Sequence, residues 1–522
     1  MTLHLHTARS VRTADGILGD SILVEDGLVV AVGEADALRG DSVEVGHGDT
    51  VLMPGLRDAH LHPVAYAAAL RGTTLYTAVN FEELNARLRT AADSVGPSSP
   101  VLGMRLNEET LAEQRLPDRW VLDAGIADRP VLAHRYCGHV AIANSAALNL
   151  AGVDETTPDP TGGLIDRDNN GLPTGVLRET AIELVADNLG GDNQATAAEL
   201  LGALGRLASV GITSIGAILR PGAGAWASLG NEVDIALEAS DQIPIKVGAY
   251  VIEETVEAVG LTKARIDTSS GRLRWLGIKR FGDGSFGGHT AAMDEPFIDV
   301  DTRGTMRLAK IDLAITRASL ALGGGAAIHA IGDAASSAVI DMFETLIGEG
   351  ADPGKLRIEH ASVLRPNDFG RLAACGAIAV VQPAFLGSEA EWLGNRLGAE
   401  RISRTYAFRS MDEAGVTMAG SSDSPVEPPD PWAGMALAQD RAGLELGQSI
   451  SAQLALAMYT NGGAVALGEP KPLAVGSPAD FLVVDRDPVL VSPDELRQTN
   501  VIRTYVDGVS VVVDENKPLW LE

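Results

Sequence analysis

Five residues that can bind a divalent metal ion lie at separate places in the chain. His60 and His62 form a His-Leu-His pair in MPGLRDAHLHP, His329 lies in AAIHAIGD, His360 in RIEHAS and Asp423 in MAGSSDSPVEP. Imidazole nitrogens and carboxylate oxygens bind Zn²⁺ and similar ions, and a metal site open to water can lower the pKa of that water towards neutrality. These residue types therefore predict a hydrolytic metal site, provided that the fold brings them together.

The His-Leu-His tripeptide occurs twice, and only one copy is assigned to this chemistry. His4 and His6 form the other copy, close to the N-terminus. Side chains two residues apart on a β-strand point to the same face, so the spacing suits either pair for binding one cation. His4 and His6 lie in a predicted strand whose polar face explains both residues without a metal. We therefore expect His60 and His62 to bind the ion.

Short apolar strands alternate with helical segments through the middle of the chain. LRIEHASVL, AIAVVQPAF and GVTMAGSSD are examples of the strand segments. The alternation predicts parallel strands joined by helical crossovers. In a parallel α/β barrel, side chains at the carboxyl ends of different strands meet at one mouth. The four histidines and Asp423 lie at or just past the ends of predicted strands, so we expect them to be neighbours.

Both ends of the chain carry β-hairpin patterns. Residues 21–33, SILVEDGLVVAVG, are two apolar runs joined by Asp26-Gly27, and VIRTYVDGVSVVV turns in the same way at Asp507-Gly508. An Asp-Gly pair between two apolar runs is typical of a two-residue hairpin turn. The two ends therefore predict one small β-domain assembled from both termini.

Length, composition and charge limit the classes of protein that fit this sequence. A chain of 522 residues is longer than one ordinary hydrophobic core accommodates, so more than one domain is expected. A content of 45% hydrophobic and 21% charged residues is typical of a folded globular protein. A formal net charge of −29 disfavours nucleic acid and anionic membrane surfaces as partners. The sequence shows no export signal, no run of about 18 apolar residues, and two cysteines, Cys137 and Cys375, which cannot form a disulfide scaffold. We expect a cytoplasmic protein with a small-molecule substrate, and a homo-oligomer is compatible with these observations.

One glycine-rich segment, GDGSFGG, begins at Gly282. Its spacing matches neither the GxxxxGKS/T pattern nor the GxGxxG pattern of phosphate-binding loops. We expect a close approach of the backbone to another segment, or a sharp turn, to explain these glycines.

The order of the motifs resembles that of the amidohydrolase superfamily. MPGLRDAHLHP is followed by GHVAIANSAAL, GLPTGVLRETA and LGIKRFGDGSFGGHTAAM, then by LRIEHASVL and AGSSDSPVEP, and the series closes with GSPADFLVVDRDP. The sequence is most similar to the YtcJ-type branch, called amidohydrolase 3. The resemblance implies an α/β fold with a distorted (β/α)8 TIM-like barrel over residues 55–465, and an insert at about 72–190 that partly covers the barrel mouth. It also implies a small β-sandwich accessory domain formed by residues 1–54 and 466–522.

The resemblance also assigns the metal site. It implies six metal ligands: His60, His62, Lys279, His329, His360 and Asp423. Zinc is the expected metal, as one or two ions. Lys279 matches a lysine that binuclear relatives carboxylate to bridge two ions, because only a carbamate replaces the ammonium charge with oxygen ligands. Asp423 is also expected to carry protons, and His329 to be a second catalytic residue that shapes the charge around the reacting carbonyl.

Four further residues are predicted to contact the substrate. They are His139 and Asn144 in GHVAIANS, and Asp283 and His289 in the loop after Lys279. Local hydrogen bonds that fix a loop are the competing explanation for all four. His289 stands where relatives usually carry an arginine, so the resemblance does not transfer a particular substrate.

These observations predict a metal-dependent hydrolase that cleaves a non-peptide C–N bond in a small amide, formamide, carbamate or lactam. A metal-activated hydroxide is expected to attack the carbonyl, while Asp423 transfers a proton from the nucleophile to the departing nitrogen. A mononuclear deaminase acting on a ring carbon is one alternative. A non-catalytic regulatory or binding protein on the same fold is another, since a fold does not fix function. An open metal site argues against the last of these, because a binding role would not need it.

Overall fold

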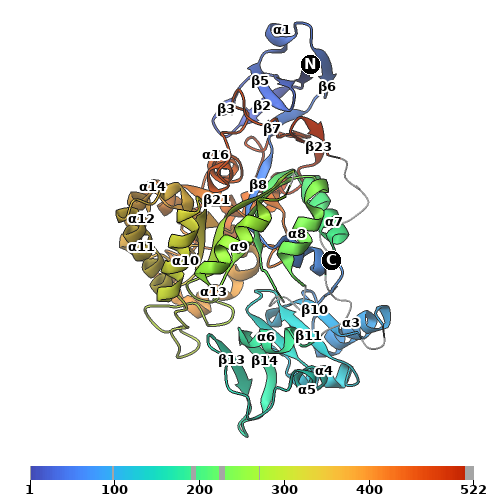
Figure 1. Ribbon diagram of the computed structural model, residues 1–522, viewed down its shortest axis with the longest axis vertical. Coiled ribbons are helices and arrows are strands. Elements are labelled where there is room, and N and C mark those ends of the chain that lie inside the picture. The colour runs from blue at the N-terminus through green and yellow to red at the C-terminus, as the bar shows by residue number, and fades with distance from the viewer. Residues whose placement is uncertain (1, 97–98, 190–194, 223–229, 270, 512–522) are drawn as a thin grey trace.

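The computed structural model describes residues 2–96, 99–189, 195–222, 230–269 and 271–511. Three parts follow one another along the longest axis of the molecule (Figure 1). Strands from the two ends of the chain lie at one pole, a barrel lies in the middle, and a mixed α/β insert lies at the opposite pole. Within the described ranges, no helix is both long enough and apolar enough to cross a membrane.

The central part is a barrel sheet of eight parallel strands. They are β8 (Leu56–Leu61), β15 (Ile212–Leu219), β16 (Lys246–Ile252), β17 (Leu273–Phe281), β18 (Gly325–Ala330), β19 (Leu356–His360), β20 (Ile378–Val381) and β21 (Met418–Gly420), and each pairs with the next in this order. At the carboxyl ends of the first and last strands, Asp423 N–H donates to His60 O and His62 N–H donates to Ser424 O, both over 2.8 Å. These bonds join the two edges and confirm the predicted TIM-like α/β barrel.

Helices connect the barrel strands and cover their outer face (Figure 1). They are α7 (Ala197–Ser209), α8 (Glu232–Ala239), α9 (Val256–Ile266), α10 (Lys310–Ala321), α11 (Asp333–Gly348), α12 (Pro366–Cys375), α13 (Phe385–Ile402) and α14 (Phe408–Ala414), followed after β21 by α15 (Pro431–Asp440), α16 (Ala452–Ala457) and α17 (Gly463–Ala466). All eight residues of β15 are buried, as expected of a parallel strand covered on both faces. Helix α7 begins with a capping box of Thr196 and Glu199 and buries a leucine stripe against the sheet.

The strands from the two ends of the chain form two sheets separate from the barrel. One has the order β5-β4-β1-β6 and the other the order β24-β23-β22-β7-β2-β3. Their strands are β1 (His4–Thr7), β2 (Ser10–Thr13), β3 (Gly16–Ile17), β4 (Ser21–Glu25), β5 (Leu28–Gly33), β6 (Val43–Gly46), β7 (Val51–Pro54), β22 (Phe481–Val484), β23 (Val501–Val506) and β24 (Val509–Ser510). Helix α1 (Ala35–Leu38) packs against β1, β4 and β5, whereas α18 (Pro493–Leu496) packs against α15. Asp26-Gly27 and Asp507-Gly508 adopt φ values of 49°, 80°, 51° and 72°. Two successive positive φ values are typical of the predicted hairpin turns, so both turns are confirmed. Residues 512 and 513 of the second pattern lie outside the described residues.

A further sheet, with the order β13-β14-β12-β11-β10-β9, lies between β8 and β15 in the chain. Its strands are β9 (Thr73–Thr74), β10 (Val101–Leu106), β11 (Val131–Arg135), β12 (Val140–Ala143), β13 (Gly163–Arg167) and β14 (Pro173–Glu179), and its helices are α3 (Phe81–Ser94), α4 (Arg119–Gly125), α5 (Ser145–Ala151) and α6 (Ala181–Ala186). These elements, called the insert below, fall within the range expected for a segment that covers the barrel mouth. The limits predicted for the barrel domain, for its insert and for the accessory domain stay a prediction.

Candidate metal-dependent active site

Closure of the barrel brings His60, His62 and Asp423 together. His60 is on β8, His62 directly precedes helix α2 (Pro63–Ala69), and Asp423 follows β21. The Nε2 atoms of His60 and His62 lie 3.2 and 3.3 Å from the same oxygen, Oδ1 of Asp423. That oxygen is buried and has no partner with hydrogen-bond geometry among the described residues. Two imidazole nitrogens beside one unsatisfied carboxylate oxygen are the arrangement expected of ligands that surround a cation.

His360 completes a cluster of three buried metal-binding groups. It ends β19, and ligand atoms of His60, His360 and Asp423 all lie within 4.8 Å of one another. Nδ1 of His360 lies 2.8 Å from Oε1 of Gln382, so Nε2 is the nitrogen left for a metal. Burial, together with the neighbouring His329, lowers the pKa of His360 well below its usual value and so favours the neutral imidazole that binds metals. This donor set fits a divalent ion.

His329 and Lys279 lie beside the cluster on the neighbouring strands β18 and β17. The ring centroid of His329 is 4.4 Å from that of His360, and Nε2 of His329 donates to the carbonyl oxygen of Gly284 over 2.8 Å. Lys279 is 1% exposed, and its Nζ finds no hydrogen-bond partner in the described part of the chain. Burial lowers the pKa of Lys279 to about 8. A buried, unpaired amine with this pKa is suited to react with CO₂, but the carbamate stays a prediction.

A buried ion pair orients His60. Nδ1 of His60 contacts Oε2 of Glu359. Arg357, two residues before Glu359 on β19, donates from Nη2 to that carboxylate over 2.9 Å and to the carbonyl oxygen of Ala59 over 2.6 Å. Glu359 and Arg357 are 0% and 1% exposed. Because Nδ1 is held by the carboxylate, Nε2 of His60 is the nitrogen that faces the metal site.

Sequence reasoning did not identify Arg357, Glu359 or Gln382 as supporting residues. A signal for the first two is present in LRIEHAS, where charged residues alternate with apolar ones along a strand of the barrel. A charged side chain inside a barrel requires a partner, so such an alternation indicates a buried ion pair. The polar Gln382 similarly follows the apolar run AIAVV.

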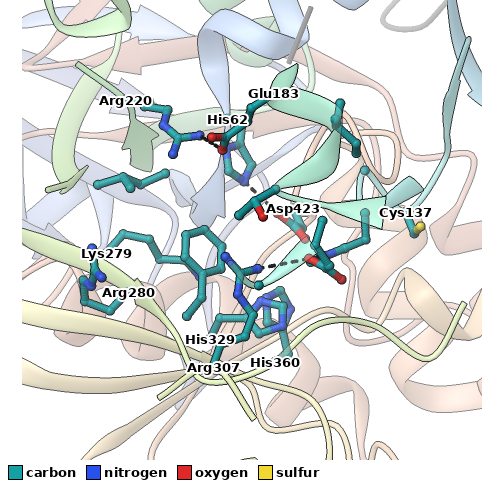
Figure 2. Close-up of a pocket in the computed structure, with 18 of the residues that line it drawn as sticks. His62, Cys137, Glu183, Arg220, Lys279, Arg280, Arg307, His329, His360 and Asp423 are labelled. Atoms are coloured by element: carbon teal, nitrogen blue, oxygen red, sulfur yellow. Dashed lines mark hydrogen bonds and ion pairs between the residues drawn. The ribbon is translucent and has the colours of Figure 1, made fainter. Parts of the chain in front are cut away.

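A cavity of about 540 Å³ opens onto the metal-binding cluster, and Figure 2 shows part of its lining. The six predicted metal ligands line it, and the insert contributes Cys137, Gly138, His139, Thr161, Glu179 and other residues up to Glu183. Arg220 and Arg307 project into the same cavity and are paired with Glu183 over 2.7 Å and with Glu179 over 3.0 Å. The insert therefore forms a wall of the cavity, and this wall carries paired charges.

His139 is the predicted substrate-contact residue that lies in the cavity wall. Its side chain is 19% exposed, and Nδ1 lies 2.9 Å from Oε2 of Glu179. Burial lowers the pKa of His139, but the Glu179 carboxylate outweighs burial and raises it to about 9. Conversely, burial raises the pKa of Glu179, but His139 and Arg307 outweigh burial and lower it to about 2. Sequence reasoning did not identify Glu179, although the residue lies in the motif GLPTGVLRETA.

The other three residues predicted to contact substrate do not line this cavity in the described structure. They are Asn144, Asp283 and His289. Asn144 caps α5, accepting two backbone N–H bonds of 2.9 and 3.0 Å and donating to two carbonyls at 2.8 and 2.9 Å. Asp283 accepts three backbone N–H bonds of 2.8, 3.0 and 2.8 Å. Nε2 of His289 lies 3.0 Å from Oδ2 of Asp299. Local hydrogen bonds, the competing explanation, account for these three side chains, and their contact with a substrate stays a prediction.

The profile of the Amidohydrolase family matches residues 48–512 of this chain. The protein therefore belongs to the amidohydrolase family. This confirms the resemblance inferred from the order of the motifs and identifies the protein as a hydrolase.

Relatives that match nearly the whole chain agree with this assignment. The chain is 27% identical over 524 residues to the putative amidohydrolase YtcJ of Bacillus subtilis (strain 168), covering 95% of this chain and 96% of that protein. It is 30% identical over 536 residues to an N-substituted formamide deformylase of Arthrobacter pascens, covering 96% of each. Among solved structures, an uncharacterized metal-dependent hydrolase from Pyrococcus horikoshii OT3 matches with a TM-score of 0.73 at 27% identity, covering 94% of this chain and 99% of that one.

Proposed function

We propose that this protein hydrolyses a non-peptide C–N bond in a small amide, formamide, carbamate or lactam, with a divalent metal ion, zinc, as its cofactor. One observation carries the proposal: donor atoms of His60, His360 and Asp423 lie within 4.8 Å of one another in the wall of a cavity of about 540 Å³. A cavity of this volume suits a small molecule. The similarity to an N-substituted formamide deformylase supports an amide-like substrate.

The proposed reaction needs a metal ion and a group that carries a proton. A divalent ion at this site would supply Lewis acidity, which polarises a carbonyl oxygen and makes water a stronger nucleophile. The ligands proposed for it are His60, His62, Lys279, His329, His360 and Asp423. Oδ1 of Asp423 lies 3.2 and 3.3 Å from two of these imidazoles, so the carboxylate reaches the centre of the site and can accept a proton from the attacking water. The same carboxyl group then donates the proton to the departing nitrogen.

Hydrolysis by metal-reconstituted protein tests the proposal. Chelator-treated protein is reloaded with zinc and assayed for amine and ammonia release from amides, formamides, carbamates and lactams. We expect activity that depends on the metal and a turnover of Asp423→Asn that is about 10²- to 10⁴-fold lower, because an amide can bind the ion through oxygen but cannot carry the proton. Equal turnover at matched zinc content would contradict the role of Asp423. Failure of the zinc-loaded protein to cleave any of these substrates would contradict the hydrolase proposal.

A further inference from the structure

The insert places one imidazole next to the proposed metal site that the proposed reaction does not use. His139 lies in the turn between β11 and β12, and its ring centroid is 5.5 Å from that of His329. His329 in turn lies 4.4 Å, centroid to centroid, from His360. A row of imidazoles therefore runs from the metal-binding cluster to the insert.

The Glu179 carboxylate fixes the orientation of His139. Oε2 of Glu179 accepts from Nδ1 of His139 over 2.9 Å and from Nη1 of Arg307 over 3.0 Å, and Oε1 accepts from Oγ1 of Thr290 over 2.6 Å. These donors come from the insert and from two places in the loop after β17, so the carboxylate cannot rotate without breaking several bonds. The Nδ1 edge of His139 is thus occupied, and the Nε2 edge is the one that the cavity can offer to a ligand.

The backbone at Glu179 and at the facing Gly284 permits the contact between Glu179 and His139. Glu179 ends β14 with a φ of 54°, in the left-handed region that residues other than glycine seldom adopt. Its N–H donates to the carbonyl oxygen of His139 over 2.9 Å, which ties the two residues together a second time. On the barrel side, a Cβ at Gly284 would lie 2.3 Å from Oε1 of Glu179. Residues other than glycine in this backbone conformation cluster at functional sites.

We propose that His139 is a substrate-contacting catalytic residue that the insert adds to the barrel, and that Glu179 is its positioning residue. Nε2 of His139 hydrogen-bonds to the polar group of the substrate that lies beside the metal. The inference rests on the proposed function, because it requires a substrate bound at that site. It gives the insert a part in the reaction in addition to covering the barrel mouth.

A latch between insert and barrel is the competing role for Glu179, through its bonds to Thr290 and Arg307. The two roles differ in how substitutions combine. If Glu179 acts through His139, its loss has no further effect once His139 is replaced. If Glu179 acts as a latch, the two losses add, as expected of independent contributions.

A double-mutant cycle on zinc-loaded protein separates the two roles. Wild type, His139→Gln, Glu179→Gln and the double variant are compared for binding of acetohydroxamate, a small amide-like metal ligand, by calorimetry. Zinc content, thermal midpoint, and kcat and KM on an N-substituted formamide are measured alongside. Asp166→Asn is the matched control, because Asp166 is an insert carboxylate that pairs with Arg178, the neighbour of Glu179, over 2.7 Å. Glu179→Asp keeps the charge and replaces Glu179→Gln if that variant does not fold.

We expect each single substitution to weaken acetohydroxamate binding and to lower kcat/KM about tenfold, as expected for one lost hydrogen bond to a polar ligand. The division of the loss between kcat and KM should be the same in both single variants, and the double variant should match His139→Gln. Zinc content should be unchanged, and Asp166→Asn should behave as wild type. Additive losses, or single variants that bind acetohydroxamate as wild type does, would overturn the proposal. If wild type binds neither zinc nor acetohydroxamate, the proposed function fails and this inference fails with it. If wild type is active and the substitutions change nothing, the inference alone fails.

Discussion

Replacing Glu359 by glutamine should destabilise the metal-free protein and weaken its metal site at the same time. The Glu359 carboxylate is fully buried and contacts both Arg357 and Nδ1 of His60. Burial raises the pKa of Glu359, but Arg357 and His60 outweigh burial and hold it well below its usual range. Glutamine has nearly the same shape, but it lacks the charge and turns one acceptor oxygen into an NH₂ group that would face another donor.

Two magnitudes follow from these contacts. Removing one partner of a buried ion pair destabilises a protein by about 3–5 kcal/mol, because the remaining charge is left uncompensated. Removing the group that orients a metal-binding histidine weakens metal affinity about 10- to 100-fold, which equals about 1.4–2.7 kcal/mol. Glu349→Gln is the matched control. Glu349 pairs with Arg317 over 2.5 Å, but the two side chains are 45% and 47% exposed, and solvent-exposed pairs contribute little.

Urea denaturation of the metal-free protein measures the first effect, and competition with a chromophoric zinc chelator measures the second. We expect Glu359→Gln to lower the urea midpoint and to raise the Kd for zinc at least about tenfold. The Glu349→Gln control should change neither value. A Glu359→Gln protein with the stability of the control and with wild-type zinc affinity would refute the reasoning that this charge holds Arg357 and His60 in place.

Metal analysis, mass spectrometry and acid titration test three other features of the molecule. His60→Ala should remove bound zinc whereas His4→Gln, on β1 of a terminal sheet, should retain it, and equal losses would contradict the assignment of the two His-Leu-His pairs. Protein reconstituted with zinc and bicarbonate should hold two ions and a carbamate on Lys279, and a single ion with an unmodified lysine would rule out a binuclear site. Burial, followed by His47 and His4, lowers the pKa of His6 from 6.5 to about 4. The unfolded chain therefore binds more protons between pH 6.5 and pH 4, so the stability of the terminal sheets should fall as the pH falls through that window. Hydrogen exchange of β1 measures this loss, and exchange in His6→Gln that responds to acid as wild type does would contradict the role of His6.

The barrel and the hairpins could be predicted because local patterns specify them. Apolar strands such as AIAVVQPAF alternate with helices, and that alternation has few solutions other than a parallel sheet with helical crossovers. Asp-Gly between apolar runs specifies a hairpin turn through the φ values that both residues must adopt. The sheet of the insert lacks such a pattern, since β11 pairs in parallel with β10 but antiparallel with β12. Its strand order depends on contacts between distant segments, so only the resemblance to a family indicated its range.

The candidate ligands could be predicted more readily than the residues that orient them. His60, His360 and Asp423 are visible as polar residues at strand ends, whereas the role of Glu359 depends on its contact with His60 on β8, a strand far from β19 in the sequence. Asn144 shows a different limit of the sequence, because its predicted substrate contact stays untested while its place directly before a helix has a local explanation. Asparagine is among the preferred N-cap residues, and the side-chain oxygen of Asn144 accepts a hydrogen bond from the backbone N–H of Ala147 in the first helical turn.

The glycine-rich loop after β17 links the barrel to the insert. A Cβ at Gly284 would lie 2.3 Å from Oε1 of Glu179, and a Cβ at Gly287 would lie 2.1 Å from Nη1 of Arg135. Both side chains belong to the insert, so close approach, one of the two explanations expected from the sequence, accounts for Gly284 and Gly287. Alanine at Gly284 must displace either the loop or the carboxylate that holds His139. The glycines of GDGSFGG therefore leave room for Glu179 and Arg135 of the insert. Through Glu179, which holds His139, this loop of the barrel influences the geometry of the candidate active site.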